Sequence, residues 1–223
     1  MPTESEREGL SIQSGNLLKA CGIIGLVGCV GLVVSNVVGS MIVPDYDWVA
    51  DTISDLGAGK YEIVQDLGFH AYAAALLACA IGAAHYHLDA GRWSFGILCL
   101  ALLAFCVEII AVRNEYGDGD DEGIVVHREI VYGLGILFTA APLLMAKGLN
   151  RVSPLYWWIS VACAVLWAIG APVFFFLPTD IDGIWERGLG VITLVWVGSL
   201  SWMLVDAGRR LERDGSYSEG PPD

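Results

Sequence analysis

The sequence predicts an all-α protein: an integral membrane bundle of six transmembrane helices. Six apolar runs cover residues 17–43, 63–86, 93–112, 124–146, 155–177 and 184–205. A helix of about 20 residues crosses the ~30 Å hydrocarbon core, which is close to the length of each run. The runs lack the alternation of a strand, and only helices and closed barrels satisfy their backbone polar groups in lipid. This class excludes most soluble enzymes and nucleic-acid-binding proteins.

The basic residues predict the orientation. Eight of the twelve Lys and Arg residues lie in the termini and alternate loops, namely Arg7, Lys19, Arg92, Lys147, Arg151, Arg209, Arg210 and Arg213. Because cytoplasmic segments carry the excess of basic residues, we expect a multi-pass protein of the cell membrane with both termini cytoplasmic. An even number of spans agrees with this expectation.

Composition divides the chain into three parts. We expect a polar cytoplasmic N-terminus at 1–16, a six-helix domain at 17–207 and a flexible cytoplasmic tail at 208–223, which is rich in Gly, Ser and Pro. The first run is too long for the apolar part of a signal peptide and follows no basic segment, so we expect it to remain in the mature protein. The net charge of -13 is typical of an acidic, archaeal-like halophile.

The first run carries glycines at a spacing of three: Gly22, Gly25, Gly28 and Gly31. Small residues at such a spacing let a neighbouring helix approach closely. We therefore expect this face to pack against other helices.

Ionisable residues within the apolar runs gather in the half that we expect to face outward. They are Asp66, His70, Glu108, His127, Arg128, Glu129, Glu186 and Arg187. Such residues are costly in a membrane and so point to function or to pairing. Glu62, Asp66 and His70 recur every four residues and therefore share one helical face. Together with Asp51, Ser54 and Asp55 of the first outer loop, these side chains could line an outward-facing polar pocket.

Two interpretations of this cluster remain open. In the first, the charges pair across helices and only stabilise the bundle, with Glu108 bound to Arg128 or Arg187. In the second, they form a binding or catalytic pocket. In either case we expect His70 to face the interior of the bundle, because a polar ring two turns deep needs a hydrogen-bond partner.

The first outer loop carries the most specific string in the chain. It reads P-D-Y-D-W at 44–48 and D-T-I-S-D-L-G-A at 51–58, where Ser54 or Asp55 can cap a short turn. We expect residues 51–58 to be ordered and packed over the ends of the helices.

This string resembles the signature of a prokaryotic membrane family, domain of unknown function 998. The resemblance covers about residues 20–207 and includes His127 and the Glu186-Arg187 pair at the starts of the fourth and sixth runs. It implies a six-span fold but no established activity. The residues Ile53, Ser54, Asp55 and Gly57 are also similar to a loop of the DRAM-type autophagy-modulator family, which would imply a membrane or lipid-regulatory role.

These observations favour a non-enzymatic membrane protein that binds a lipid headgroup, a small molecule or a partner protein in the outer pocket. One alternative is a membrane-embedded metal hydrolase with His70, His127 and one of Asp55, Asp66 or Glu129 as ligands. Another is a cation- or proton-coupled transporter that uses Asp66, His70 and Glu108. We expect no resident cofactor or metal. The expected partners are membrane lipids, with a protein partner or a second copy of the chain as further possibilities.

Overall fold

The described part of the chain forms six long helices and one short helix. The computed structural model describes residues 14–89, 91–112 and 127–218, and the side chains of residues 127, 128 and 214–218 lie outside that description. The long helices are α2 (Gly15–Ile42), α4 (Glu62–His85), α5 (Gly91–Val112), α6 (His127–Asn150), α7 (Pro154–Phe174) and α8 (Asp182–Ser218), and the short one is α3 (Ile53–Leu56). Each long helix is long and apolar enough to cross a membrane, and the described residues contain no strand. The all-α, six-helix prediction is therefore confirmed.

The helices begin where the sequence offers a cap. The Ser14 side chain accepts a hydrogen bond from the backbone of Leu17 at the start of α2, and Ser153 caps α7, whose first residue is Pro154. Pro142 and Pro172 lie inside α6 and α7. The helix α8 continues to Ser218, beyond residue 207, where the sequence predicted the bundle to end.

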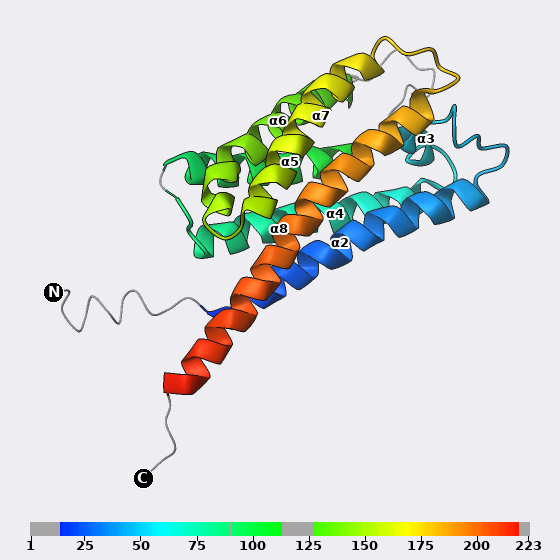
Figure 1. Ribbon diagram of the computed structural model, residues 1–223. Coiled ribbons are helices and arrows are strands. Elements are labelled where there is room, and N and C mark those ends of the chain that lie inside the picture. The colour runs from blue at the N-terminus through cyan, green and yellow to red at the C-terminus, as the bar shows by residue number, and fades with distance from the viewer. Residues whose placement is uncertain (1–13, 90, 113–126, 219–223) are drawn as a thin grey trace.

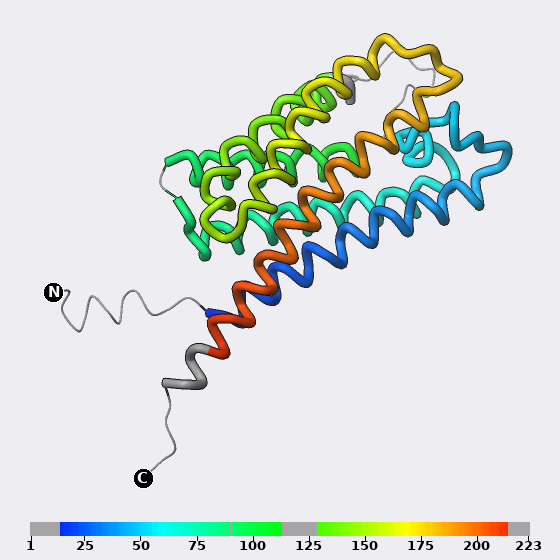
Figure 2. Tube along the Cα trace, in the orientation of Figure 1, coloured from blue at the N-terminus to red at the C-terminus, as the bar shows by residue number. Residues whose placement is uncertain are grey.

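The six long helices pack as a closed ring. Each packs against the next in sequence, α8 returns to α2, and α8 also contacts α4 (Figure 1). As a result, the beginning of α2 and the far part of α8 lie side by side at one end (Figure 2), where a Cβ atom on Gly15 would lie 2.7 Å from the carbonyl oxygen of Gly208. We call this the termini end and the opposite one the α3 end.

The glycine face of α2 is used for close helix packing, as predicted. A Cβ atom on Gly25 would collide with the Ser201 side chain of α8, and one on Gly28 would collide with the Ala71 carbonyl oxygen of α4. Both neighbouring backbones can approach α2 only because these positions lack side chains. The spacing of three thus serves two partner helices.

Apolar side chains cover both the inside and the outside of the ring. Trp93, Trp196 and Leu100 are buried inside it, whereas Val27 and Phe105 are among many large apolar side chains on its outer surface. An apolar outer surface of this extent would be unstable in water but is what a lipid environment requires.

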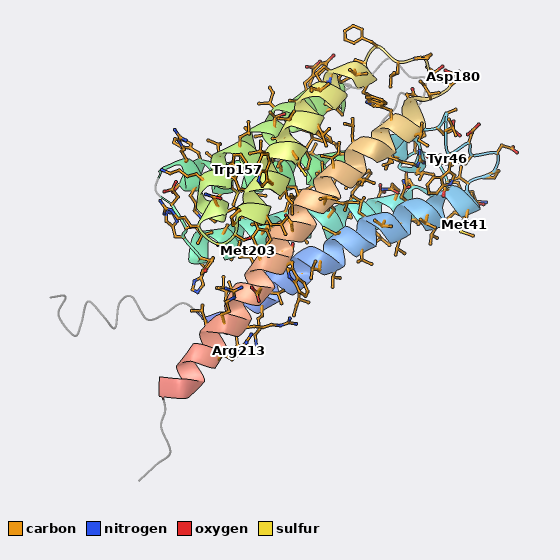
Figure 3. The ribbon with its side chains drawn as sticks, viewed as in Figure 1. Met41, Tyr46, Trp157, Asp180, Met203 and Arg213 are labelled. Carbon is orange, nitrogen blue, oxygen red and sulfur yellow. The ribbon has the colours of Figure 1, made fainter. Side chains whose placement is uncertain are left out.

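The two ends carry different polar groups. Figure 3 places Tyr46 and Asp180 at the α3 end and Arg213 at the termini end. At the termini end, the Arg151 guanidinium lies 2.8 Å from the Asp89 carboxylate and joins the loop after α4 to the loop after α6. The candidate site residues lie at the other end.

Candidate functional site at the α3 end

The short helix α3 forms because two residues at its start satisfy each other's backbone N–H groups. The Thr52 hydroxyl accepts a hydrogen bond from the Asp55 backbone at 3.1 Å, and the Asp55 carboxylate accepts one from the Thr52 backbone at 2.7 Å. This reciprocal capping box satisfies backbone groups that a four-residue helix would otherwise leave exposed. Residues 51–58 contain a packed helix, as expected, but the N-cap is Thr52 with Asp55 as its capping-box partner, where the sequence suggested Ser54 or Asp55 as the cap.

The loop before α3 is folded by its own carboxylates. Asp47 accepts a hydrogen bond from the backbone of Val49, and Asp51 accepts one from the backbone of Asp47, both at 2.8 Å. Aspartate favours such local turns because its side chain reaches nearby backbone groups. The Asp51 carboxylate is therefore engaged within the loop.

Arg187 attaches this loop to the start of α8. Its Nη1 atom donates hydrogen bonds to the carbonyl oxygens of Trp48 at 3.0 Å, Asp51 at 2.8 Å and Gly183 at 2.9 Å, and its Nη2 atom donates to the Tyr46 hydroxyl. The guanidinium also lies 4.7 Å from the centroid of the Trp48 ring, within the range of a cation–π interaction. A planar group with five donors is well matched to several carbonyls at once.

Glu186 attaches α3 to the same turn of α8. Its carboxylate accepts a hydrogen bond from the Ile53 backbone at 2.6 Å and one from the Ser54 hydroxyl at 3.3 Å. These contacts satisfy a backbone N–H at the start of α3 that the helix itself leaves without a partner. We call Glu186, Arg187 and residues 46–55 the latch.

Tyr46 completes the latch. Its hydroxyl lies 3.0 Å from the Asp51 carbonyl oxygen and 2.6 Å from that of Thr52, to which it can donate. Burial raises the pKa of Tyr46 to about 12, although the hydrogen bond and positive charge of Arg187 act in the opposite direction. The phenol therefore stays protonated and able to donate at neutral pH. Sequence reasoning assigned no role to Tyr46, although an aromatic residue within the specific loop string was the available signal.

A second polar pair lies on the neighbouring helices α4 and α5. The Nδ1 atom of His70 lies 3.0 Å from both carboxylate oxygens of Glu108. The two side chains are 40% and 48% exposed, so the ring does not lie in the closed interior, and the prediction that His70 faces inward is wrong. Of the two predicted partners of Glu108, Arg187 is wrong, because its guanidinium binds loop carbonyls instead, and the side chain of Arg128 lies outside the described residues.

The remaining candidates lie around this pair or outside the described part. Asp66 is half-buried one turn before His70 on α4, and Glu129 is exposed in the first turn of α6. The side chains of His127 and Arg128 are not among the described residues.

The structure thus separates the predicted pocket into two groups. One is the latch, which uses Asp51, Ser54, Asp55, Glu186 and Arg187, and the other is His70 with Glu108, with Asp66 one turn away. Over the described ranges, no three His, Cys, Asp or Glu side chains lie close enough together to hold a metal ion. What the second group offers chemically is a histidine whose ring is oriented by a carboxylate.

Comparison with known proteins identifies the family. A sequence model of the family described as protein of unknown function (DUF998) matches residues 26–203, which run from α2 into α8 and include both groups. The chain belongs to this family. The DUF998 match confirms the resemblance seen in the loop string and in the six-span layout. No match was found among curated proteins or among solved structures.

Proposed function

We propose that this DUF998 protein binds an ammonium group at His70 and Glu108, from the outer side of the membrane. The observation that carries the proposal is a half-exposed pair of ionisable side chains inside two membrane-spanning helices. The proposal places the α3 end outside the cell and both termini in the cytoplasm.

The depth of the pair supports this proposal. His70 is eight residues from the start of α4, which is roughly 12 Å along the helix at 1.5 Å per residue, and Glu108 is about 6 Å from the end of α5. An ionisable side chain exposed to lipid at depth costs on the order of 3 kcal/mol or more. Such a pair is stable only where it meets water or a polar ligand.

The chemistry of the pair favours a cationic ligand. Because Nδ1 of His70 faces the Glu108 carboxylate, the proton belongs on Nδ1 and the other ring nitrogen, Nε2, is left as an acceptor. The carboxylates of Glu108 and Asp66 add negative charge on either side. An ammonium group can donate to Nε2 and is attracted by both carboxylates, whereas a phosphate would be repelled by them.

Binding of a primary amine to the purified protein tests the proposal. We expect phosphatidylethanolamine to raise the thermal stability in detergent micelles, and phosphatidylcholine, whose ammonium has no N–H donor, to do so much less. Free ethanolamine carries the same ammonium group without the lipid. Stabilisation by ethanolamine as well would indicate a soluble amine as the ligand, and stabilisation by the lipid alone would indicate a lipid headgroup.

Substitutions at the pair make the test specific. Losing a charge-assisted hydrogen bond costs about 1.5–3 kcal/mol, so Glu108→Gln and His70→Ala should weaken binding roughly 10-fold or more. Glu62→Gln is the matched control, because Glu62 is an exposed carboxylate in the first turn of the same helix and should change binding about 2-fold at most. Equal binding by the wild type and the Glu108→Gln variant would exclude this function.

Proton-coupled transport is a second candidate that the same pair supports. A histidine oriented by a carboxylate is also a proton acceptor, and the pair lies within the span where a transported proton would pass. Proton uptake by proteoliposomes that accompanies amine entry, and that Glu108→Gln removes, would favour transport over binding alone. The hydrolase alternative stays a prediction that depends on His127.

The orientation that the proposal requires has a direct test. A cysteine replacing Ser216, near the end of α8, should not react with an impermeant thiol reagent added to intact cells, whereas Lys60→Cys in the outer loop should react. The excess of basic residues at the termini end supports this orientation.

The net charge of -13 supports a source that lives in high salt.

A further inference from the structure

Two buried amide side chains, one on α2 and one on α4, lie towards the α3 end of the bundle. Gln65 is 0% exposed and Asn36 is 8% exposed. Within the described residues, neither end of the Gln65 amide has a hydrogen-bond partner, and the same holds for the Nδ2 atom of Asn36. Leaving a buried polar group without a partner costs about 1–3 kcal/mol, so two such amides require an explanation.

The register of the two helices brings these amides to the same level. A Cβ atom on Gly68 of α4 would collide with the Ser35 side chain of α2, so these residues face each other across the interface. Asn36 follows Ser35, and Gln65 lies one turn before Gly68 on the antiparallel helix. Both amides therefore belong to one layer of the α2–α4 interface.

The helix α3 lies over this layer with its apolar side chains inward. It contacts α2, α4 and α8. Leu56 is 1% exposed and packs on Gly39, one turn from Asn36, and Ile53 packs on Gly190 of α8. A four-residue helix buries too little surface to stay in place alone, so the contacts of Glu186 with Ile53 and Ser54 hold it there.

We propose that α3 is a removable plug, and that lifting it admits a small uncharged hydrogen-bonding solute to Asn36 and Gln65. Two neutral amides provide donors and acceptors without net charge, which matches a hydroxyl or amide group better than an ion. This site differs from the His70 site: five residues along a helix turn it by about 140°, and Gln65 is buried where His70 is half-exposed.

Thiol labelling measures access to the site. The probe is 2-hydroxyethyl methanethiosulfonate, a neutral hydroxyl-bearing reagent, applied to Asn36→Cys and separately to Gln65→Cys, with the signal of the unsubstituted chain subtracted. We expect labelling to be slow, and Glu186→Gln to accelerate it about 10-fold. A 10-fold change corresponds to weakening the state with α3 in place by ~1.4 kcal/mol. Lys60→Cys, exposed in the outer loop, should react equally fast with and without Glu186→Gln. Unchanged labelling at both positions 36 and 65 would overturn the proposal.

The charge of the reagent tests the class of solute. Labelling rates at positions 36 and 65 are measured in the Glu186→Gln background and divided by the rate at Lys60→Cys with the same reagent. On this scale the negatively charged 2-sulfonatoethyl methanethiosulfonate should react about 10-fold more slowly than the hydroxyethyl reagent. Equal relative rates would show that the site does not prefer uncharged groups.

A disulfide provides an independent test of the plug. A Cβ atom on Gly39 would lie 3.8 Å from the Leu56 Cβ atom, which is the separation that a disulfide requires. Gly39→Cys/Leu56→Cys should therefore cross-link α3 to α2 and slow deuterium exchange of the backbone amides in residues 62–72 about 10-fold, and reduction should reverse the effect. Failure of the cross-link to form, or exchange that is equally fast in the oxidised and reduced protein, would contradict a plug at this place.

Discussion

The latch and the His70–Glu108 pair use similar side chains at the same end of the bundle, yet they differ in what those side chains bind. Arg187 and Glu186 contact backbone groups of a folded loop, with donor-to-acceptor distances of 2.6–3.0 Å for the backbone contacts. Glu108 contacts one imidazole and leaves 48% of its side chain exposed. The comparison shows that an ionisable residue in a membrane helix has a structural role when the backbone occupies its polar atoms. An ionisable residue remains available for a ligand when part of its own polar side chain is exposed.

Removing Arg187 should have the largest effect on stability. Arg187→Ala leaves the carbonyl oxygens of Trp48, Asp51 and Gly183 without this donor, and hydrogen bonds to charged groups contribute about 1.5–3 kcal/mol each without being additive. We expect the free energy of unfolding in detergent to fall by about 3 kcal/mol, with faster proteolysis of residues 44–60. Arg210→Ala is the control, because Arg210 is exposed and bound to Asp206 on its own helix, and it should cost at most about 1 kcal/mol. If the two variants are equally stable, the latch does not have the structural role assigned to it.

Tyr46→Phe should have an intermediate effect that depends on pH. Near pH 7 we expect a loss of about 1 kcal/mol, because the hydroxyl no longer donates to the loop carbonyls. The pKa of Tyr46 is raised by burial to about 12, so its stabilising contribution is fully present below the unfolded pKa of about 10 and is lost as the pH rises towards 12. The wild type should therefore lose more stability than Tyr46→Phe between pH ~10 and pH ~12 when unfolding is followed by denaturant titration. Parallel pH profiles of the two proteins would refute this assignment.

Glu108→Gln should have the smallest effect on stability. The two side chains are about half exposed, so solvent screens their contact, and glutamine keeps a hydrogen-bonding oxygen close to His70; we expect a loss of at most about 1 kcal/mol. The same substitution should weaken amine binding roughly 10-fold, so the two measurements separate function from folding. A loss of unfolding free energy as large as that of Arg187→Ala would place the pair with the latch as a structural element.

The spans and their packing face could be predicted because each depends on nearby residues. Apolar length alone defines a membrane-crossing helix, and the spacing of Gly22, Gly25 and Gly28 defines a face that accepts close neighbours. A capped turn at α3 could also be anticipated from its polar residues, although the cap is Thr52, which forms a capping box with Asp55, and not Ser54 or Asp55 as suggested.

The partners of the ionisable residues could not be predicted, because they depend on the fold of the loop. Charge complementarity suggested Arg128 or Arg187 for Glu108, but the loop turns the carbonyls of Trp48 and Asp51 towards α8, and the Arg187 guanidinium donates to those oxygens instead. His70 and Glu108 are 38 residues apart and meet only through the register of α4 and α5. Likewise, the burial of Gln65 and Asn36 depends on how the helices pack and could not be read from the sequence.

The closed ring has a consequence for the order in which the protein is assembled during synthesis. The helix α2 is made well before α8, to which Ser201, the neighbour of Gly25, belongs. At ~5–20 residues per second, roughly 180 further residues take on the order of ten seconds or more. During that interval α2 and α4 must rest in the membrane as a hairpin joined by contacts such as Gly28 with Ala71 and Gly68 with Ser35. Any surveillance of the nascent protein in the membrane would therefore see an incomplete ring, with Gly22 and Gly25 of α2 uncovered, until α8 has been inserted.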